Sequence, residues 1–427
     1  MCDNDVVKWG RLYTSGSVFL FSALALVFAS GYSVGPTLLF LLSIFYLIPP
    51  IFCRLKIFPQ TKLKKTDVYL MAAFLFYFAI LTAEVLWFHL EIRDLDKPVR
   101  FLLAIPVLLL LLRCPPHLAA LWGGVMVGGL SAGIIAIVQK FVLGYERANG
   151  FIFVIQFGDL SMLLGILSVA GIAWCRTQPH AHLWQAGLGL AAIGGITASF
   201  LSGSRGGWIG LPLIMFMLAR SYSDFMGWRQ WIKIGGICIF WGGALAVTPG
   251  SGIIDRVHQA QSDVNHYQDG NAETSLGARF DLWRMANYMY GHRPIFGYGT
   301  QAFLDMRPEM VERFGYSKYI LDLGSAHNEY LDAAAKRGTL GLFALLSIYL
   351  VPLALFSRYR RSRDLTVRSL SLAGMLVPLC FMDFGISQVL FTHNSGVMVY
   401  PYLLAVLWAC LRYRLVQLHW TKRGVQV

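Results

Sequence analysis

The sequence predicts an all-α protein that crosses a membrane many times, and three observations lead to this fold class. Of its 427 residues, 56% are hydrophobic and only 14% are charged, which is far more apolar than a soluble globular protein. The apolar residues are concentrated in about twelve runs long enough for transmembrane helices. The connections between these runs alternate between basic and non-basic, as expected of a multi-pass protein.

Crossing a hydrocarbon core takes about 20 apolar residues, and runs near this length recur along the chain. We place the spans at 16–33, 34–53, 67–90, 100–112, 117–143, 151–175, 183–200, 207–219, 231–248, 339–356, 369–391 and 395–411. The chain then divides into nine spans in 1–248, a long and partly helical loop at 249–338, and three spans with a basic tail in 339–427.

The basic connections give the expected orientation. Lys and Arg are frequent in the N-terminal segment, in the tail, and in the connections after spans two, eight and ten, at 54–65, 220–233 and 358–368. Cytoplasmic loops carry such an excess, so the long loop at 249–338 is expected on the opposite side. This placement also accounts for the net charge of +13, and we expect no nucleic-acid partner.

Metal ions and disulfides are not expected to organise the long loop. None of the seven cysteines lies within 249–338, and His258, His266 and His292 do not form a pair at metal-ligand spacing. The loop also lacks an Asp-x-Asp pair that could hold a divalent cation. We therefore expect no metal and no cofactor.

Two short connections on the side of the long loop each carry an isolated arginine: Arg147 in GYERANG and Arg205 in SGSRGG. Glycine and serine residues let a backbone turn approach an anion, and an arginine adds a bidentate group for phosphate oxygens. The alternatives are an arginine that reaches lipid headgroups, and, for Arg147, pairing with Glu146. The glycine-rich turn at 202–210 favours phosphate binding by Arg205.

Residues 276–290 have the spacing of an amphipathic helix. Its apolar face would comprise Phe280, Trp283, Ala286, and Met289 or Tyr290, and its polar side Arg279, Asp281 and Arg284. Such a helix would lie on the membrane surface with its arginines toward solvent or a ligand. A plain interfacial helix is the competing interpretation. The bend in HRPIFGYGTQAF then returns the chain toward the site.

Residues 324–338, GSAHNEYLDAAAKRG, are predicted to form a short helix with Ser325 as its N-cap. His327 would lie in the first turn, where the helix dipole disfavours the charged imidazolium. A neutral imidazole can act as a general base. A lone histidine is more often structural, and this alternative stays open on the residues alone.

SGSRGGW, GARFDLW, RPIFGYGTQAF and SAHNEYLDAAAKRGTLGL occur in this order and resemble the O-antigen ligase and polymerase superfamily of bacterial inner membranes. The resemblance implies that His327 is the essential base and that Arg205 and Arg279 engage a pyrophosphate. It further suggests Arg147, Arg284, Asn328 and Tyr298 as substrate-binding residues. Asp383 is the nearest match to an acidic residue that family members carry in a late span.

The resemblance implies transfer of O-antigen polysaccharide from undecaprenyl pyrophosphate to a sugar hydroxyl of lipid A-core, at the periplasmic face of the inner membrane. Direct displacement would be metal-independent and would invert the anomeric centre. An O-antigen polymerase or a protein-glycosylating ligase would use the same donor. A transporter of the lipid-linked sugar is the alternative from another class; Glu84, Asp159 and Asp383 are its candidate intramembrane charges.

Overall fold

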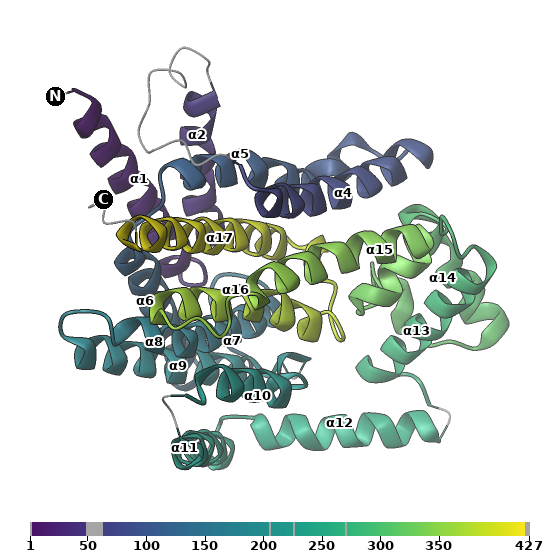
Figure 1. Ribbon diagram of the computed structural model, residues 1–427. Coiled ribbons are helices and arrows are strands. Elements are labelled where there is room, and N and C mark those ends of the chain that lie inside the picture. Colours follow the sequence, from purple (N-terminus) through teal and green to yellow (C-terminus); the bar gives the residue numbers. More distant parts are fainter. Residues whose placement is uncertain (1, 48–62, 205, 225–226, 270, 423–427) are drawn as a thin grey trace.

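The computed structural model describes residues 2–47, 63–204, 206–224, 227–269 and 271–422, and all regular secondary structure within them is helical (Figure 1). The bundle comprises α1 (Cys2–Ala23), α2 (Gly31–Leu47), α4 (Lys65–Trp87), α5 (Val99–Arg113), α6 (Leu118–Ile137), α7 (Val154–Ala170), α8 (Ile172–Cys175), α9 (Ala181–Ser202), α10 (Leu211–Tyr222), α11 (Trp228–Val247), α15 (Glu329–Ser357), α16 (Leu365–Phe384) and α17 (Asn394–Lys422). Three further helices, α12 (Ile253–Gln268), α13 (Ser275–His292) and α14 (Thr300–Phe314), occupy most of the predicted long loop.

Short helical turns connect several of these elements. They are η1 (Ile92–Asp96), the π-helical turn η2 (Val138–Val142), η3 (Gly206–Trp208), η4 (Lys318–Asp322) and η5 (Leu390–Thr392). Three of them, η1, η3 and η5, lie between α4 and α5, between α9 and α10, and between α16 and α17, respectively.

Eight helices of the described residues are long and apolar enough to cross a membrane, compared with the twelve spans predicted. Each predicted span overlaps a helix, but α2, α5 and α10 have only 17, 15 and 12 residues. The predicted boundary between the first two spans, at residues 33 and 34, is also displaced. Helix α1 begins in the polar N-terminal segment and ends at Ala23, and α2 begins at Gly31.

Helix α17 passes through the centre of the bundle, between α5 and α16 (Figure 1). In α17, 94% of the most apolar stretch is buried, compared with 6% in α11, which packs only at the edge of the molecule. Helices α6 and α9 approach each other closely because glycines face one another. A Cβ atom at Gly133 would lie 2.6 Å from the Cα atom of Gly194, the small-residue packing typical of membrane helices.

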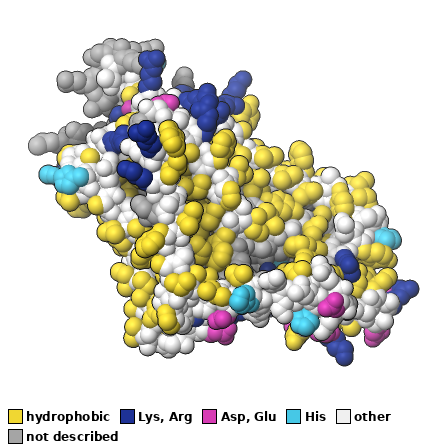
Figure 2. All heavy atoms as spheres, turned by 90° about the horizontal axis from the view of Figure 1, so that it is seen from below, with side chains coloured by type: hydrophobic (Ala, Val, Ile, Leu, Met, Phe, Trp, Pro, Cys, Tyr) yellow, Lys and Arg dark blue, Asp and Glu magenta, His cyan; other side chains and the backbone are white. Residues whose placement is uncertain are grey.

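Ion pairs join the basic connections and tail at one end of the bundle. Asp67 of α4 accepts hydrogen bonds from Arg412 of α17, and Arg414 pairs with Asp364 before α16. Figure 2 shows a dense group of Lys and Arg side chains at one end of the face in view. Apolar side chains cover the middle, and basic, acidic and histidine side chains are mixed at the opposite end, where α13 and α14 lie.

Helices α13 and α14 enclose a small core of their own. Its members are Ala278, Leu282, Met285, Ala286, Met289, Phe303, Met310, Ile320, Ala326 and Ala335. Helix α13 confirms the predicted helix at 276–290, but the face that is buried differs from the predicted apolar face. Asp281 is 2% exposed, because its carboxylate accepts hydrogen bonds from the backbone N–H of Ser317 at 2.9 Å and from the hydroxyl of Tyr267 at 3.2 Å.

Helix α15 consists of two helices that meet at a kink at Gly338, so the short helix predicted within 324–338 ends where expected but begins later, at Glu329. The part after Gly338 is the predicted membrane span. The N-cap is Asn328 rather than Ser325, so His327 lies before the helix and not in its first turn. Gly338 has φ 63° and ψ −156°, a conformation that only glycine adopts readily.

Candidate functional site

The backbone at His327 is held in an unusual conformation. His327 has φ 48°, in the left-handed region that few residues other than glycine occupy. The peptide before it is fixed on both sides: Ala326 donates its N–H to Asp332 Oδ1 at 3.0 Å, and its carbonyl oxygen accepts the indole N–H of Trp283 at 2.9 Å. Strain that the surroundings maintain in this way is frequent at functional sites.

Asn328 fixes the other side of His327. Its Oδ1 atom caps α15 by accepting the N–H groups of Tyr330 and Leu331. Its Nδ2 atom donates to the carbonyl oxygen of Ile386 at 3.0 Å, in the connection between α16 and α17. Both ends of the amide are therefore bound to backbone, and Asn328 serves first to place His327 against this connection.

The imidazole of His327 has one nitrogen engaged. Nδ1 lies 2.8 Å from Oε1 of Gln388, a residue only 2% exposed. An amide oxygen can only accept a hydrogen bond, so Nδ1 carries the hydrogen and Nε2 carries the lone pair of the neutral ring. Nε2 is then the atom that can accept a proton from a substrate.

The pKa of His327 is lowered from 6.5 to about 4, mainly by burial and then by the positive charge of Arg279. Both effects disfavour the imidazolium. The ring is therefore neutral at pH 7, as the prediction of a general base requires. The same effect shows that Arg279 lies within electrostatic range of His327.

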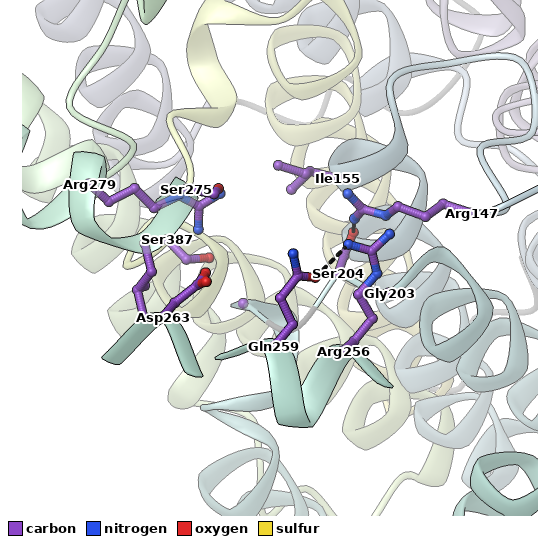
Figure 3. Close-up of a pocket in the computed structure, with 12 residues that line it drawn as sticks. Arg147, Ile155, Gly203, Ser204, Arg256, Gln259, Asp263, Ser275, Arg279 and Ser387 are labelled. Atoms are coloured by element: carbon purple, nitrogen blue, oxygen red, sulfur yellow. Dashed lines mark hydrogen bonds between the residues drawn. The ribbon is translucent and has the colours of Figure 1, made fainter. Parts of the chain in front are cut away.

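A cleft lies beside these residues and offers water molecules a volume of about 130 Å³ (Figure 3). Its lining comes from separate parts of the chain: Arg147, Ile155, Gly203, Ser204, Gly206, Arg256, Gln259, Asp263, Ser275, Leu276, Arg279 and Ser387. In Figure 3, Arg279 points into the space from one side, and Arg147 and Arg256 point into it from the other. Three guanidinium groups around one space favour binding of an anion such as a phosphate.

Arg147 is held against the turn after α9. Its Nε atom donates to the carbonyl oxygen of Ser202 at 2.7 Å, and a terminal nitrogen lies 3.5 Å from the hydroxyl of Ser204. Glu146, the partner considered from the sequence, instead pairs with Arg256. Arg147, Arg279 and the described residues of the 202–210 turn thus lie around one cleft. The alternation of basic and non-basic connections predicts all of them on the same side of the membrane.

Arg205, the predicted centre of the 202–210 turn, lies outside the described residues. Its neighbours Ser204 and Gly206 both line the cleft. The following turn packs on two aspartates: Asp383 Oδ1 accepts the N–H of Gly210 at 2.6 Å, and a Cβ atom at Gly207 would lie 3.0 Å from an oxygen of Asp159. Asp383 thus anchors the turn that contains the predicted phosphate-binding residues.

Helix α12 supplies cleft residues that the sequence interpretation missed. Arg256, Gln259 and Asp263 line the same cleft, and their i, i+3, i+7 spacing places them on one face of the helix. Residues 249–275 are polar throughout, so these three side chains do not stand out by composition. Their helical spacing is the sequence feature that could have identified them as one polar face.

Three predicted substrate-binding residues, Asn328, Arg284 and Tyr298, do not line the cleft, and the predicted base His327 is not among its lining residues either. Arg284 lies over the ring of Tyr267 with a mostly exposed side chain. Tyr298 packs under the guanidinium of Arg293 and donates its N–H to Ala335. Arg284 therefore joins α13 to α12, and Tyr298 joins the segment before α14 to Arg293 and to α15.

Glu84, considered as an intramembrane charge for transport, has structural partners. Its carboxylate pairs with Arg337 at 2.9 Å and accepts both the N–H and the hydroxyl of Thr300 at the start of α14. Glu84 therefore connects α4 to the start of α14 and to α15.

Comparisons with known proteins relate the sequence to a family. The sequence model of the O-antigen ligase family matches residues 190–346, which include the 202–210 turn, α12, α13 and His327. The chain is 32% identical over 386 residues to an uncharacterized protein of Haemophilus influenzae, covering 90% of this chain and 94% of that protein. It is 24% identical over 125 residues to the O-antigen ligase of Escherichia coli, covering 29% of this chain and 30% of that one. The chain belongs to the O-antigen ligase family.

Proposed function

We propose that the protein transfers O-antigen polysaccharide from undecaprenyl pyrophosphate to a sugar hydroxyl of lipid A-core. The observation that carries this proposal is the position of His327, a neutral base within electrostatic range of Arg279, whose side chain lines an arginine-rich cleft. A lipid-linked pyrophosphate is the anionic donor that such a cleft suits, and a hydroxyl group is the acceptor that a neutral imidazole can deprotonate.

In the proposed reaction, the acceptor hydroxyl loses its proton to Nε2 of His327 as its oxygen forms a bond to the anomeric carbon. The bond between that carbon and the pyrophosphate oxygen breaks, and the electron pair leaves with undecaprenyl pyrophosphate. Arg279, Arg147 and Arg256, together with Arg205, would stabilise the growing charge on the leaving group. Direct displacement inverts the configuration of the anomeric carbon.

Charge distribution supports the proposed location at the periplasmic face of the inner membrane. The cleft lies at the end of the bundle opposite the ion-paired basic connections, such as Arg368 with Asp224 and Arg412 with Asp67. Basic connections face the cytoplasm in multi-pass proteins. The cleft would then meet a donor and an acceptor that are both presented on the far side of the membrane.

Reconstitution of the reaction with purified protein in detergent tests this proposal. Donor polymer on undecaprenyl pyrophosphate and lipid A-core acceptor are incubated with and without a chelator, and the product is followed by a shift in gel mobility. We expect polymer on lipid A-core, unaffected by the chelator, and a loss of about 10²- to 10⁴-fold for His327→Ala. The variant should insert and elute from a sizing column like the wild type.

The outcomes separate the alternatives. A fully active His327→Ala protein would exclude His327 as the base. Elongation of a donor repeat unit without transfer to lipid A-core would identify a polymerase. Absence of any transfer, with movement of the donor across a vesicle membrane, would identify a transporter.

A further inference from the structure

Three polar side chains form a hydrogen-bonded series that ends at His327. Oε1 of Gln388 lies 2.8 Å from Nδ1 of His327, and Nε2 of Gln388 lies 3.4 Å from Nε2 of His393. Gln388 is 2% exposed, and the ring of His393 stacks on Phe153 with a centroid separation of 5.9 Å. The series crosses from the segment before α15 to the connection between α16 and α17.

The two ends of an amide are not equivalent, and this fixes the hydrogen positions along the series. With its NH₂ group directed at His393, Gln388 presents only its oxygen to His327. His327 must then carry its hydrogen on Nδ1, and Nε2 is left with the lone pair. If the amide were reversed, its NH₂ group would require the lone pair on Nδ1 and would place the hydrogen on Nε2, which could no longer accept a proton.

We propose that Gln388 is a positioning residue that holds His327 in its base-competent tautomer, and that His393 sets the orientation of the Gln388 amide. This inference rests on the proposed function, in which Nε2 of His327 accepts the proton of the acceptor hydroxyl. It adds two residues, 61 and 66 positions along the chain from His327, that the sequence motifs do not contain.

The neutrality of Gln388 has a second effect. A carboxylate at this position would stabilise the imidazolium and raise the pKa of His327, whereas an amide orients the ring without adding charge. The other charged and titratable groups that influence His327 are Arg279 on α13, Asp332 on α15 and His393. Lys97, at the connection between α4 and α5, acts on His393.

The segment around Gln388 is held without help from its side chain. On one side, Gly385 and Ile386 accept hydrogen bonds from the backbone of Glu329 and the side chain of Asn328, at 2.7 and 3.0 Å. On the other side, the Glu329 carboxylate accepts the N–H of Leu390 at 2.6 Å. Substitutions of Gln388 are therefore expected to leave this connection folded.

The test compares pH–rate profiles of full-length Gln388→Leu and Gln388→Glu with the wild type. Leucine removes the acceptor for Nδ1–H, and we expect kcat to fall about 10- to 100-fold, within the contribution of a general base, with KM for the donor unchanged. Glutamate keeps an acceptor, and we expect substantial activity whose acid limb moves to higher pH. Partial rescue by glutamate together with this shift would not arise from a merely structural role.

One control and two variants of His393 complete the experiment. Gln156→Leu makes the same change at a residue that is 1% exposed and whose amide has no hydrogen-bond partner among the described residues; it should keep wild-type activity. His393→Phe removes the acceptor for the Gln388 amide, and we expect a loss of kcat smaller than that of Gln388→Leu, whereas His393→Gln should restore activity.

The possible outcomes distinguish this inference from the proposed function. Loss of activity in His327→Ala with unchanged kcat and acid limb in both Gln388 variants would overturn the positioning role and leave the base intact. Full activity of His327→Ala would overturn the proposed mechanism itself. An equal loss of kcat in Gln388→Leu and Gln388→Glu, without any shift in the profile, would also overturn the positioning role.

Discussion

Trp283 donates its indole N–H to the carbonyl oxygen of Ala326 at 2.9 Å. Ala326 immediately precedes His327, and Trp283 lies one helical turn after Arg279 on α13. A single side chain thus connects the helix that carries a cleft arginine to the segment that carries the proposed base.

We expect Trp283→Phe to weaken this connection without emptying its packing. A smaller aromatic ring fills most of the space, but the hydrogen bond, worth about 1 kcal/mol, is lost. Turnover in the ligation assay should fall several-fold with little change in the unfolding temperature. Trp241→Phe is the matched control, because it removes an indole bond of 2.8 Å to Thr197, away from the cleft. Equal turnover in the two variants would contradict the role of Trp283.

The lowered pKa of His327 predicts an unusual pH dependence. Because the neutral ring is the base, kcat should stay high on the acid side until the pH approaches about 4, rather than falling near the ordinary value of about 6.5. In Arg279→Gln, loss of the positive charge raises this pKa, so the residual activity should decline at a higher pH. An unchanged acid limb in Arg279→Gln would show that the two groups are not coupled.

The same shift links stability to pH. The pKa of His327 is lower in the folded protein than in the unfolded chain, so the unfolded state binds the proton more readily between these two values. The contribution of His327 to stability is complete above pH 6.5 and is lost as the pH falls toward about 4. The unfolding temperature of the wild type should therefore decrease more over this range than that of His327→Ala.

Arg256 on α12 tests the cleft independently of the sequence motifs. Arg256→Gln removes one charge from the wall opposite Arg279, and a hydrogen bond to a charged group is worth about 1.5–3 kcal/mol. We expect kcat/KM for the donor to fall about 10-fold or more. Arg229→Gln, an exposed arginine at the start of α11, should leave kcat/KM unchanged. Similar behaviour of the two variants would remove α12 from the binding site.

Gly338 is the joint between the outer part of α15 and its membrane-crossing part. A Cβ atom there would lie 2.3 Å from the carbonyl oxygen of Ile295, and φ is +63°. We expect Gly338→Ala to lower the free energy of unfolding by about 1–3 kcal/mol or more, measured by thermal unfolding in detergent. Gly291→Ala, where a Cβ atom meets nothing within 4 Å, should be neutral or slightly stabilising; a comparable loss there would contradict this explanation.

Local sequence patterns predicted most of the helices and also predicted which connections lie at the same end of the bundle. The apolar runs locate the bundle helices, and the alternation of basic connections is enough to place Arg147 and His327 at the same end of the bundle. The start of α15 was wrong because Ser325 and Asn328 are both good N-cap residues. Asn328 prevails because its amide also reaches Ile386, 58 residues away, a contact that no local pattern contains.

Long-range partners explain the other differences. Asp281 looks like a surface residue in its helix, yet it is buried because Ser317 and Tyr267 satisfy its carboxylate. Gln388 has no distinctive neighbours in sequence, and its contact with the ring of His327, 61 residues away, is visible only in the folded chain. The sequence motifs therefore lead to the proposed base, whereas the residues that contact it come from distant parts of the chain.

The cleft includes Ser387, just beyond the end of α16, whereas the ion pair of Arg368 with Asp224 lies at the start of the same helix. Figure 2 shows apolar side chains between the basic group at one end and the mixed polar side chains at the other. For the proposed reaction, this separation sets an order of events. A donor glycan assembled at the basic end would not reach Arg279 by diffusion through the apolar middle, because its hydroxyl and phosphate groups would have to lose their water. The proposed transfer would then depend on a separate translocation step that delivers the loaded carrier.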